Sequence, residues 1–153
     1  MKILIADDKK DSEKIHELYA EWSAEKVSPK TLPLTLKELA EQLKKSTTFI
    51  AKEADELVGF LICKIKKSKE DTIMYHLKKG EEYAELDSIY IKKNHRKKGI
   101  GTALINSCRA ELKKHNYKKL IVLADSIKPK ELMSFYEKNG FETLFVSMIS
   151  DKL

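Results

Sequence analysis

The chain has 153 residues, of which 42% are apolar and 35% are charged, and its formal net charge is +6. This length and composition predict a single domain spanning residues 1–153, and they exclude a disordered chain and a membrane-spanning one. Two cysteines are too few for a disulfide framework. The first residues turn acidic before an apolar signal region could form, so we expect a cytoplasmic protein.

The basic residues are almost all lysines. Among the 30 basic side chains only Arg96 and Arg109 are arginines, the residue that favours bidentate contacts with phosphates and bases. The lysines lie in scattered pairs among glutamates, which is typical of a solvated surface. A basic nucleic-acid-binding or ribosome-associated module is therefore an alternative that the composition disfavours.

Apolar periodicity and turn residues predict a mixed α/β domain with the order β-α-α-β-β-β-α-β-α-β. The predicted strands are residues 2–6, 48–52, 57–66, 83–91, 119–124 and 141–149. The predicted helices begin after a cap at Asp11 or Ser12, at Leu36, near Gly101 and at Pro129, and the last one ends at Asn139-Gly140. Residues 68–82 are polar and are expected to form a loop.

The most informative segment lies between the strand at 83–91 and the helix that follows it. It reads Asn94-His95-Arg96-Lys97-Lys98-Gly99-Ile100-Gly101-Thr102-Ala103. Glycine permits positive φ angles and close approach to a ligand, and the first amides of a helix have no intrahelical partner. With three consecutive cations beside these amides, the segment predicts a site for an anion such as pyrophosphate. Its spacing fits neither a Walker loop nor a dinucleotide fingerprint.

Within that segment, Arg96-Lys97-Lys98-Gly99-Ile100-Gly101 resembles the pyrophosphate loop R/Q-x-x-G-x-G/A of the GNAT superfamily of acyl-CoA N-acyltransferases. Residues 84–91 are similar to the family's fourth strand, and Leu57-Val58-Gly59-Phe60 is similar to the start of its third. Residues 134–141, SFYEKNGF, resemble its C-terminal FYEKxGF motif. One departure is Pro129, seven residues before Tyr136, in a region where many members carry an asparagine.

The resemblance covers nearly the whole chain. It implies a GNAT-like fold, an α/β domain whose central mixed, mostly antiparallel sheet is flanked by helices. It also implies an acetyl-CoA-dependent N-acetyltransferase. By the same resemblance, acetyl-CoA would contact the backbone of the fourth strand and the residues of the loop, namely Ile89, Tyr90, Ile91, Arg96, Lys97, Lys98, Gly99, Ile100, Gly101 and Thr102.

Acetyl transfer to an amine needs a base to deprotonate the ammonium, fixed donors for the oxyanion and an acid for the leaving thiolate. Glu85 and Asp87 are two residues apart and therefore project from one face of their strand. Either carboxylate could serve as the base, directly or through water. The alternative is that both are solvent-facing acids. Tyr136 is the candidate acid, because a phenol can donate a proton to sulfur.

We expect the two cysteines to have structural roles. Cys63 lies in an apolar strand, and Cys108 shares a helix with Leu104 and Leu112, so both are expected to pack in the core. The four histidines show no ligand spacing, and we expect no metal site.

The expected partners are acetyl-CoA and an amine acceptor. The acceptor is left open between a small-molecule amine or polyamine and a protein amine. A second alternative is a GNAT-like domain that holds acyl-CoA as a sensor without turnover. The last predicted strand, residues 141–149, could also pair or exchange between the subunits of a homodimer.

Overall fold

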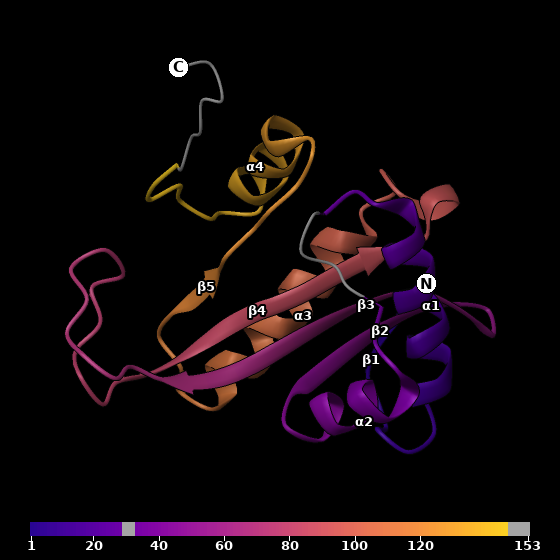
Figure 1. Ribbon diagram of the computed structural model, residues 1–153, viewed down its shortest axis with the longest axis horizontal. Coiled ribbons are helices and arrows are strands. Elements are labelled where there is room, and N and C mark those ends of the chain that lie inside the picture. The colour runs from indigo at the N-terminus through magenta and orange to yellow at the C-terminus, as the bar shows by residue number, and fades with distance from the viewer. Residues whose placement is uncertain (29–32, 147–153) are drawn as a thin grey trace.

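The computed structural model describes residues 1–28 and 33–146. In this part of the chain a sheet of five strands has the order β1-β2-β3-β4-β5 (Figure 1). The strands are β1 (Lys2–Ile5), β2 (Thr47–Glu53), β3 (Glu56–Lys67), β4 (Glu82–Ile91) and β5 (Leu120–Val122). The first four pair antiparallel with their neighbours, and β5 pairs parallel with β4. The mixed, mostly antiparallel sheet expected from the sequence is confirmed.

Helices cover both faces of the sheet. They are α1 (Ser12–Glu25), α2 (Leu36–Lys44), α3 (Ile100–Lys114) and α4 (Pro129–Lys138), with a short 3-10 turn at Lys93–His95. One apolar core joins α1 and α2 to the sheet face that carries Phe60 and Tyr90. A second core joins α3 and α4 to the opposite face, which carries Leu61 and Leu86.

The helix ends show how local sequence sets the element bounds. Thr35 and Glu38 form a reciprocal capping box at the start of α2. Gly140, with φ +74°, follows the end of α4 as its stop signal predicted. Asp11 is the residue before α1, but its carboxylate does not cap the helix. It accepts hydrogen bonds from the amide of Asp7 and from Lys52 Nζ instead.

The prediction of a sixth strand at 141–149 is wrong for residues 141–146, which have no strand structure, while residues 147–149 lie outside the described part. Phe141 is used for tertiary packing rather than strand pairing, whereas Leu144, Phe145 and Val146 are 47–57% exposed. The Phe141 ring lies 5.3 Å from the Tyr136 ring and 4.8 Å beneath the Arg109 guanidinium. Strand propensity records the fit of a side chain to a half-buried surface, so it does not guarantee a ladder.

The pairing of β4 creates the site. Ser88 faces Ile62 and Leu86 faces Cys63, so Asp87 is the extra residue of a β-bulge. On its other edge, β4 pairs with β5 only as far as Leu86, which faces Val122. Since β5 is shorter than the predicted 119–124, the two strands separate beyond this point, and Figure 1 shows β5 diverging from β4.

No helix in residues 1–28 and 33–146 has the length and apolar character needed to cross a membrane.

Candidate active site

A cavity of about 500 Å³ occupies the space where β4 and β5 separate, and we call it the gap cavity. Residues 86–91 of β4 line one side, and residues 122–126 line the other. The cavity also includes Leu132, Phe135 and Tyr136 of α4. The start of α3 lines it as well. The gap cavity is thus enclosed by the separated parts of β4 and of the chain after β5, by the start of α3 and by α4.

The glycine-containing loop lies at this cavity. Lys97 and Gly99 both have left-handed backbone conformations, with φ angles of +60° and +79°. The first amide that bonds within α3 is that of Ala103, which donates to the Gly99 carbonyl at 3.0 Å. Among the described residues, nothing accepts from the amides of residues 97–102. These free amides at a helix N-terminus suit a phosphate group.

The predicted acetyl-CoA contacts fall on the gap cavity with one exception. Ile89, Tyr90 and Ile91 of β4 line it, as do the loop residues Arg96, Lys97, Gly99, Ile100, Gly101 and Thr102. Lys98 is not among the lining residues. Gly101 packs closely against α4: a Cβ there would lie 3.0 Å from Phe135 Cζ, so the ring would have to shift by a few tenths of an ångström.

Tyr136 lies in the last turn of α4, lines the gap cavity and is only 8% exposed. Its ring packs edge-on against Phe135 and Phe141, with centroids 5.2 and 5.3 Å away. Burial raises the pKa of the Tyr136 phenol, and the nearby Asp125 carboxylate raises that pKa further. The hydroxyl therefore stays protonated at neutral pH, as a proton donor must.

Both candidate bases are ion-paired. Asp87 accepts from Lys64 Nζ at 2.5 Å and also from the Gln42 amide and the Ser88 hydroxyl, each at 2.9 Å. Glu85 pairs with Lys66 Nζ at 2.6 Å. Neither carboxylate is thus an isolated charge in an apolar strand. Asp87 lines the gap cavity at the bulge, whereas Glu85 does not.

Several residues at the cavity were not singled out by their sequence pattern. Trp22 and Ser28, from the end of α1 and the chain beyond it, line the gap cavity. Asp125 lines it from the far side and accepts from Ser28 Oγ at 3.0 Å. The available signal was the position of Asp125 just after a parallel strand, where α/β sheets gather ligand-binding residues.

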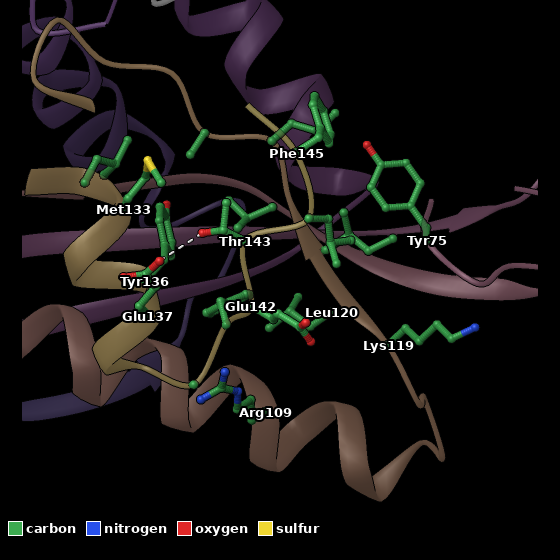
Figure 2. Close-up of a pocket in the computed structure, with 18 of the residues that line it drawn as sticks. Tyr75, Arg109, Lys119, Leu120, Met133, Tyr136, Glu137, Glu142, Thr143 and Phe145 are labelled. Carbon is green, nitrogen blue, oxygen red and sulfur yellow. Dashed lines mark hydrogen bonds between the residues drawn. The ribbon is translucent and has the colours of Figure 1, made fainter. Parts of the chain in front are cut away.

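A larger cavity of about 1120 Å³ lies on the other side of β5, between α4 and residues 141–146. Figure 2 shows Tyr136 and Glu137 of α4 beside Thr143, whose hydroxyl donates to Glu137 Oε1 at 3.1 Å. Arg109 enters from α3. Tyr136 lines both cavities, whereas no residue of the loop at 95–102 lines the larger one.

The two cysteines are part of the core. Cys63 is 2% exposed and Cys108 is fully buried, as the sequence predicts. The hydrogen bond between the two thiols and their burial raise the pKa of Cys108. Cys108 is therefore a neutral thiol rather than a thiolate nucleophile.

Comparisons with known proteins agree with this geometry. The model of the acetyltransferase (GNAT) family matches residues 12–141. A ribosomal-protein-alanine N-acetyltransferase from Brucella melitensis biovar Abortus 2308 is 20% identical, with a TM-score of 0.71 over 97% of this chain and 96% of that one. The aminoglycoside N-acetyltransferase AAC(6')-Iy, in complex with CoA, is 16% identical, with a TM-score of 0.72 over 99% of each chain.

A predicted acetyltransferase with acetyl-CoA from Clostridium acetobutylicum is 18% identical, with a TM-score of 0.72 over 99% of this chain and 92% of that one. No curated protein matches the chain in sequence. At these identities the solved structures establish the fold alone.

A mixed sheet that opens between β4 and β5 above a helix N-terminus is the fold of the N-acetyltransferases that use acetyl-CoA. Since the family model matches most of its length, this chain belongs to the acetyltransferase (GNAT) family, and acetyl-CoA is its cosubstrate.

Proposed function

We propose that the protein transfers the acetyl group of acetyl-CoA to a primary amine by direct attack within a ternary complex. The observation that carries the proposal is that a single cavity is lined both by loop residues with free amides, 97 and 99–102, and by Tyr136, whose hydroxyl stays protonated. The acceptor belongs to one of two classes, a small-molecule amine or polyamine, or a protein amine.

The residues present fit acetyl-CoA. In this proposal the amides of residues 97–102 bind the pyrophosphate, and the cations of Lys97 and Lys98 compensate its charge. Neither lysine forms an ion pair with another described residue, so both are available to an anion. Residues 89–91 of β4 lie beyond the pairing with β5, so this edge offers backbone groups to the pantetheine arm and to the developing oxyanion. The bound cosubstrate supplies the acetyl thioester.

The reaction needs two proton transfers, one assigned to Tyr136 and one to a carboxylate of β4. Tyr136 donates its proton to the departing sulfur. The acceptor enters from the side of Asp87, which lies at the bulge in the cavity wall and takes a proton from the ammonium directly or through water. Among the two β4 acids, the cavity lining favours Asp87 over Glu85.

The solved structures suggest which amines to test first. Their names specify an aminoglycoside in one case and the alanine of a ribosomal protein in another. Both are primary amines, which agrees with the proposed chemistry, and they represent the two acceptor classes left open by the sequence.

A thiol-release assay tests the function. Purified protein with acetyl-CoA is offered an aminoglycoside, spermidine or a peptide with an N-terminal alanine, and the acetylated product is identified by mass spectrometry. We expect amine-dependent release of CoA with one of these classes. Tight CoA binding in calorimetry without release, for every amine, would instead support the acyl-CoA sensor.

Asp87→Asn is expected to lower kcat/KM for the acceptor by about tenfold or more. The decrease in kcat/KM should become larger as the pH falls. Without the Asp87 carboxylate, the variant can acetylate only acceptor molecules whose amine is already neutral, and their fraction decreases at lower pH. Glu85→Gln is the matched control. Each variant removes one carboxylate of β4 and leaves one lysine of β3 without its ion-pair partner. The measurement is the pH profile of kcat/KM for both variants. Equal activity of the two would remove Asp87 as the base.

A further inference from the structure

Arg96 is the first residue of the loop motif, but its guanidinium is already bound within the protein. Nη2 donates to both carboxylate oxygens of Glu25, at 2.7 and 2.8 Å. Nε donates to the Ile91 carbonyl at 2.9 Å, and the guanidinium carbon lies 5.4 Å from the centre of the Tyr90 ring. The charge of Arg96 is therefore compensated by Glu25, unlike the charges of Lys97 and Lys98.

Glu25 joins α1 to β4 as well as to the loop. It is the last residue of α1, and its side chain is 21% exposed. Besides the two bonds from Arg96, it accepts from the Tyr90 hydroxyl at 2.7 Å. Burial and the Glu25 carboxylate raise the pKa of Tyr90, so this hydroxyl remains a donor. A half-buried carboxylate with these charge-assisted bonds holds the end of α1 at a defined position.

The chain immediately after Glu25 crosses to the other side of the gap cavity. Lys26 turns it with a left-handed conformation, φ +50°. The Val27 carbonyl then accepts from the Ile127 amide at 3.0 Å, and Ser28 Oγ donates to Asp125 at 3.0 Å. Residues 25–28, the bridge segment, thus connect the end of β4 to the chain after β5. Val27 and Ser28 line the cavity.

Arg96 is therefore linked directly to the bridge segment, because its ion-pair partner Glu25 is the first residue of that segment. Arg96 lies beside the amides that suit the pyrophosphate, and Glu25 begins the segment that forms a wall of the same cavity. Because the bridge segment reaches both walls of the cavity, its position determines the width of the space left for an acceptor beside the thioester arm. A shift of about 1 Å in such a wall can cost as much as 10²-fold in rate.

We propose that Glu25 and Arg96 are positioning residues for the acceptor amine, holding the bridge segment across the gap cavity, and that Arg96 is not a ligand of the pyrophosphate. The inference rests on the proposed acetyl transfer for its kinetic consequence. Its structural consequence, that the Glu25–Arg96 pair fixes the Val27–Ile127 contact, can be measured without any acceptor.

The test compares Glu25→Gln, Arg96→Lys and the double variant with Glu21→Gln. Glu21 lies one turn earlier on α1, and within the described part of the chain its only ion pair is a long one with Lys92, at 3.7 Å, so its variant is a matched charge control. CoA affinity is measured by calorimetry, and exchange of the Ile127 amide hydrogen by NMR. Kinetics use acetyl-CoA with the amine that is acetylated in the panel above.

Glu25→Gln and Arg96→Lys are each expected to raise the acceptor KM and the Ile127 exchange rate by about tenfold, with CoA affinity changed by no more than about twofold. The double variant should be no worse than the poorer single variant, because both changes break one contact. Glu21→Gln should behave as the wild type.

Arg96→Lys with much weaker CoA binding, beside a normal Glu25→Gln, would make Arg96 a pyrophosphate ligand and overturn the proposal. Unchanged Ile127 exchange in both single variants would overturn it as well. If no amine in the panel is acetylated by the wild type, the proposed function fails. Ile127 exchange and CoA affinity then still decide whether Arg96 fixes the bridge segment or binds CoA.

Discussion

Replacing Tyr136 with phenylalanine is expected to lower kcat by about 10²–10⁴-fold, the usual loss when a general acid is removed. The phenylalanine ring keeps the edge-on contacts with Phe135 and Phe141. Only the hydroxyl at the gap cavity is deleted, so folding and CoA affinity should change little. A loss confined to the chemical step appears in kcat rather than in KM.

Tyr117→Phe provides the matched control. Tyr117 lines the larger cavity but not the gap cavity, whereas Tyr136 lines both. If acetyl transfer takes place in the gap cavity, Tyr117→Phe should retain wild-type kcat. Near-normal kcat in Tyr136→Phe would assign Tyr136 to packing, and the thiolate would then leave unassisted or take its proton from water.

The pH dependence of Tyr136 follows from its raised pKa. In the unfolded chain a tyrosine ionises near pH 10, while folded Tyr136 keeps its proton to higher pH. The folded state then binds more protons than the unfolded state above about pH 10, so stability must fall as the pH rises further. We therefore expect Tm to fall less above about pH 10 in Tyr136→Phe than in the wild type. We also expect that the kcat of the wild type does not decrease near pH 10 through ionisation of Tyr136.

Gly99→Val is expected to weaken CoA binding by about 100-fold or more, since it disrupts the amides that suit the pyrophosphate. Gly99 has φ +79°, a conformation that costs an L-residue about 1–2 kcal/mol and a β-branched one more. Apart from its chain neighbours, no described atom lies within 4 Å of a Cβ at this position, so the main cost of the change is backbone strain. Relief of the strain must come from a changed backbone in the loop.

Gly80→Val is the control for backbone strain. Gly80 has φ +85°, and a Cβ there would meet only Lys67 Cε, at 3.7 Å. It lies in the 68–82 loop, outside the gap cavity. Gly80→Val should lose similar stability in thermal unfolding but bind CoA normally in calorimetry. Gly101 is less suitable for this test, because its substitution would push against Phe135 of α4. Wild-type CoA affinity in Gly99→Val would refute the phosphate site.

The features that the sequence predicted well depend on neighbouring residues. Apolar spacing and turn residues predicted α1–α4, and the Asn139-Gly140 pattern agrees with the observed end of α4. The loop from Arg96 to Thr102 was recognisable because glycines, cations and a helix start are adjacent along the chain. The strand predicted at 141–149 does not form over 141–146, because an apolar pattern does not supply a strand partner: Phe141 packs against distant residues, while Leu144, Phe145 and Val146 are exposed.

The composition of the site depended on contacts between distant residues. Asp87 and Glu85 share a face as their spacing implies, but only the register of β3 against β4 places Lys64 and Lys66 beside them. The ion pair of Arg96 was not predictable in this way, because its partner Glu25 lies 71 residues away. Local sequence thus predicted most of the elements and the position of the glycine-containing loop before α3. Strand register and helix packing decided which charges remain available to a ligand, because a long-range ion pair leaves no mark in the pattern of neighbouring residues.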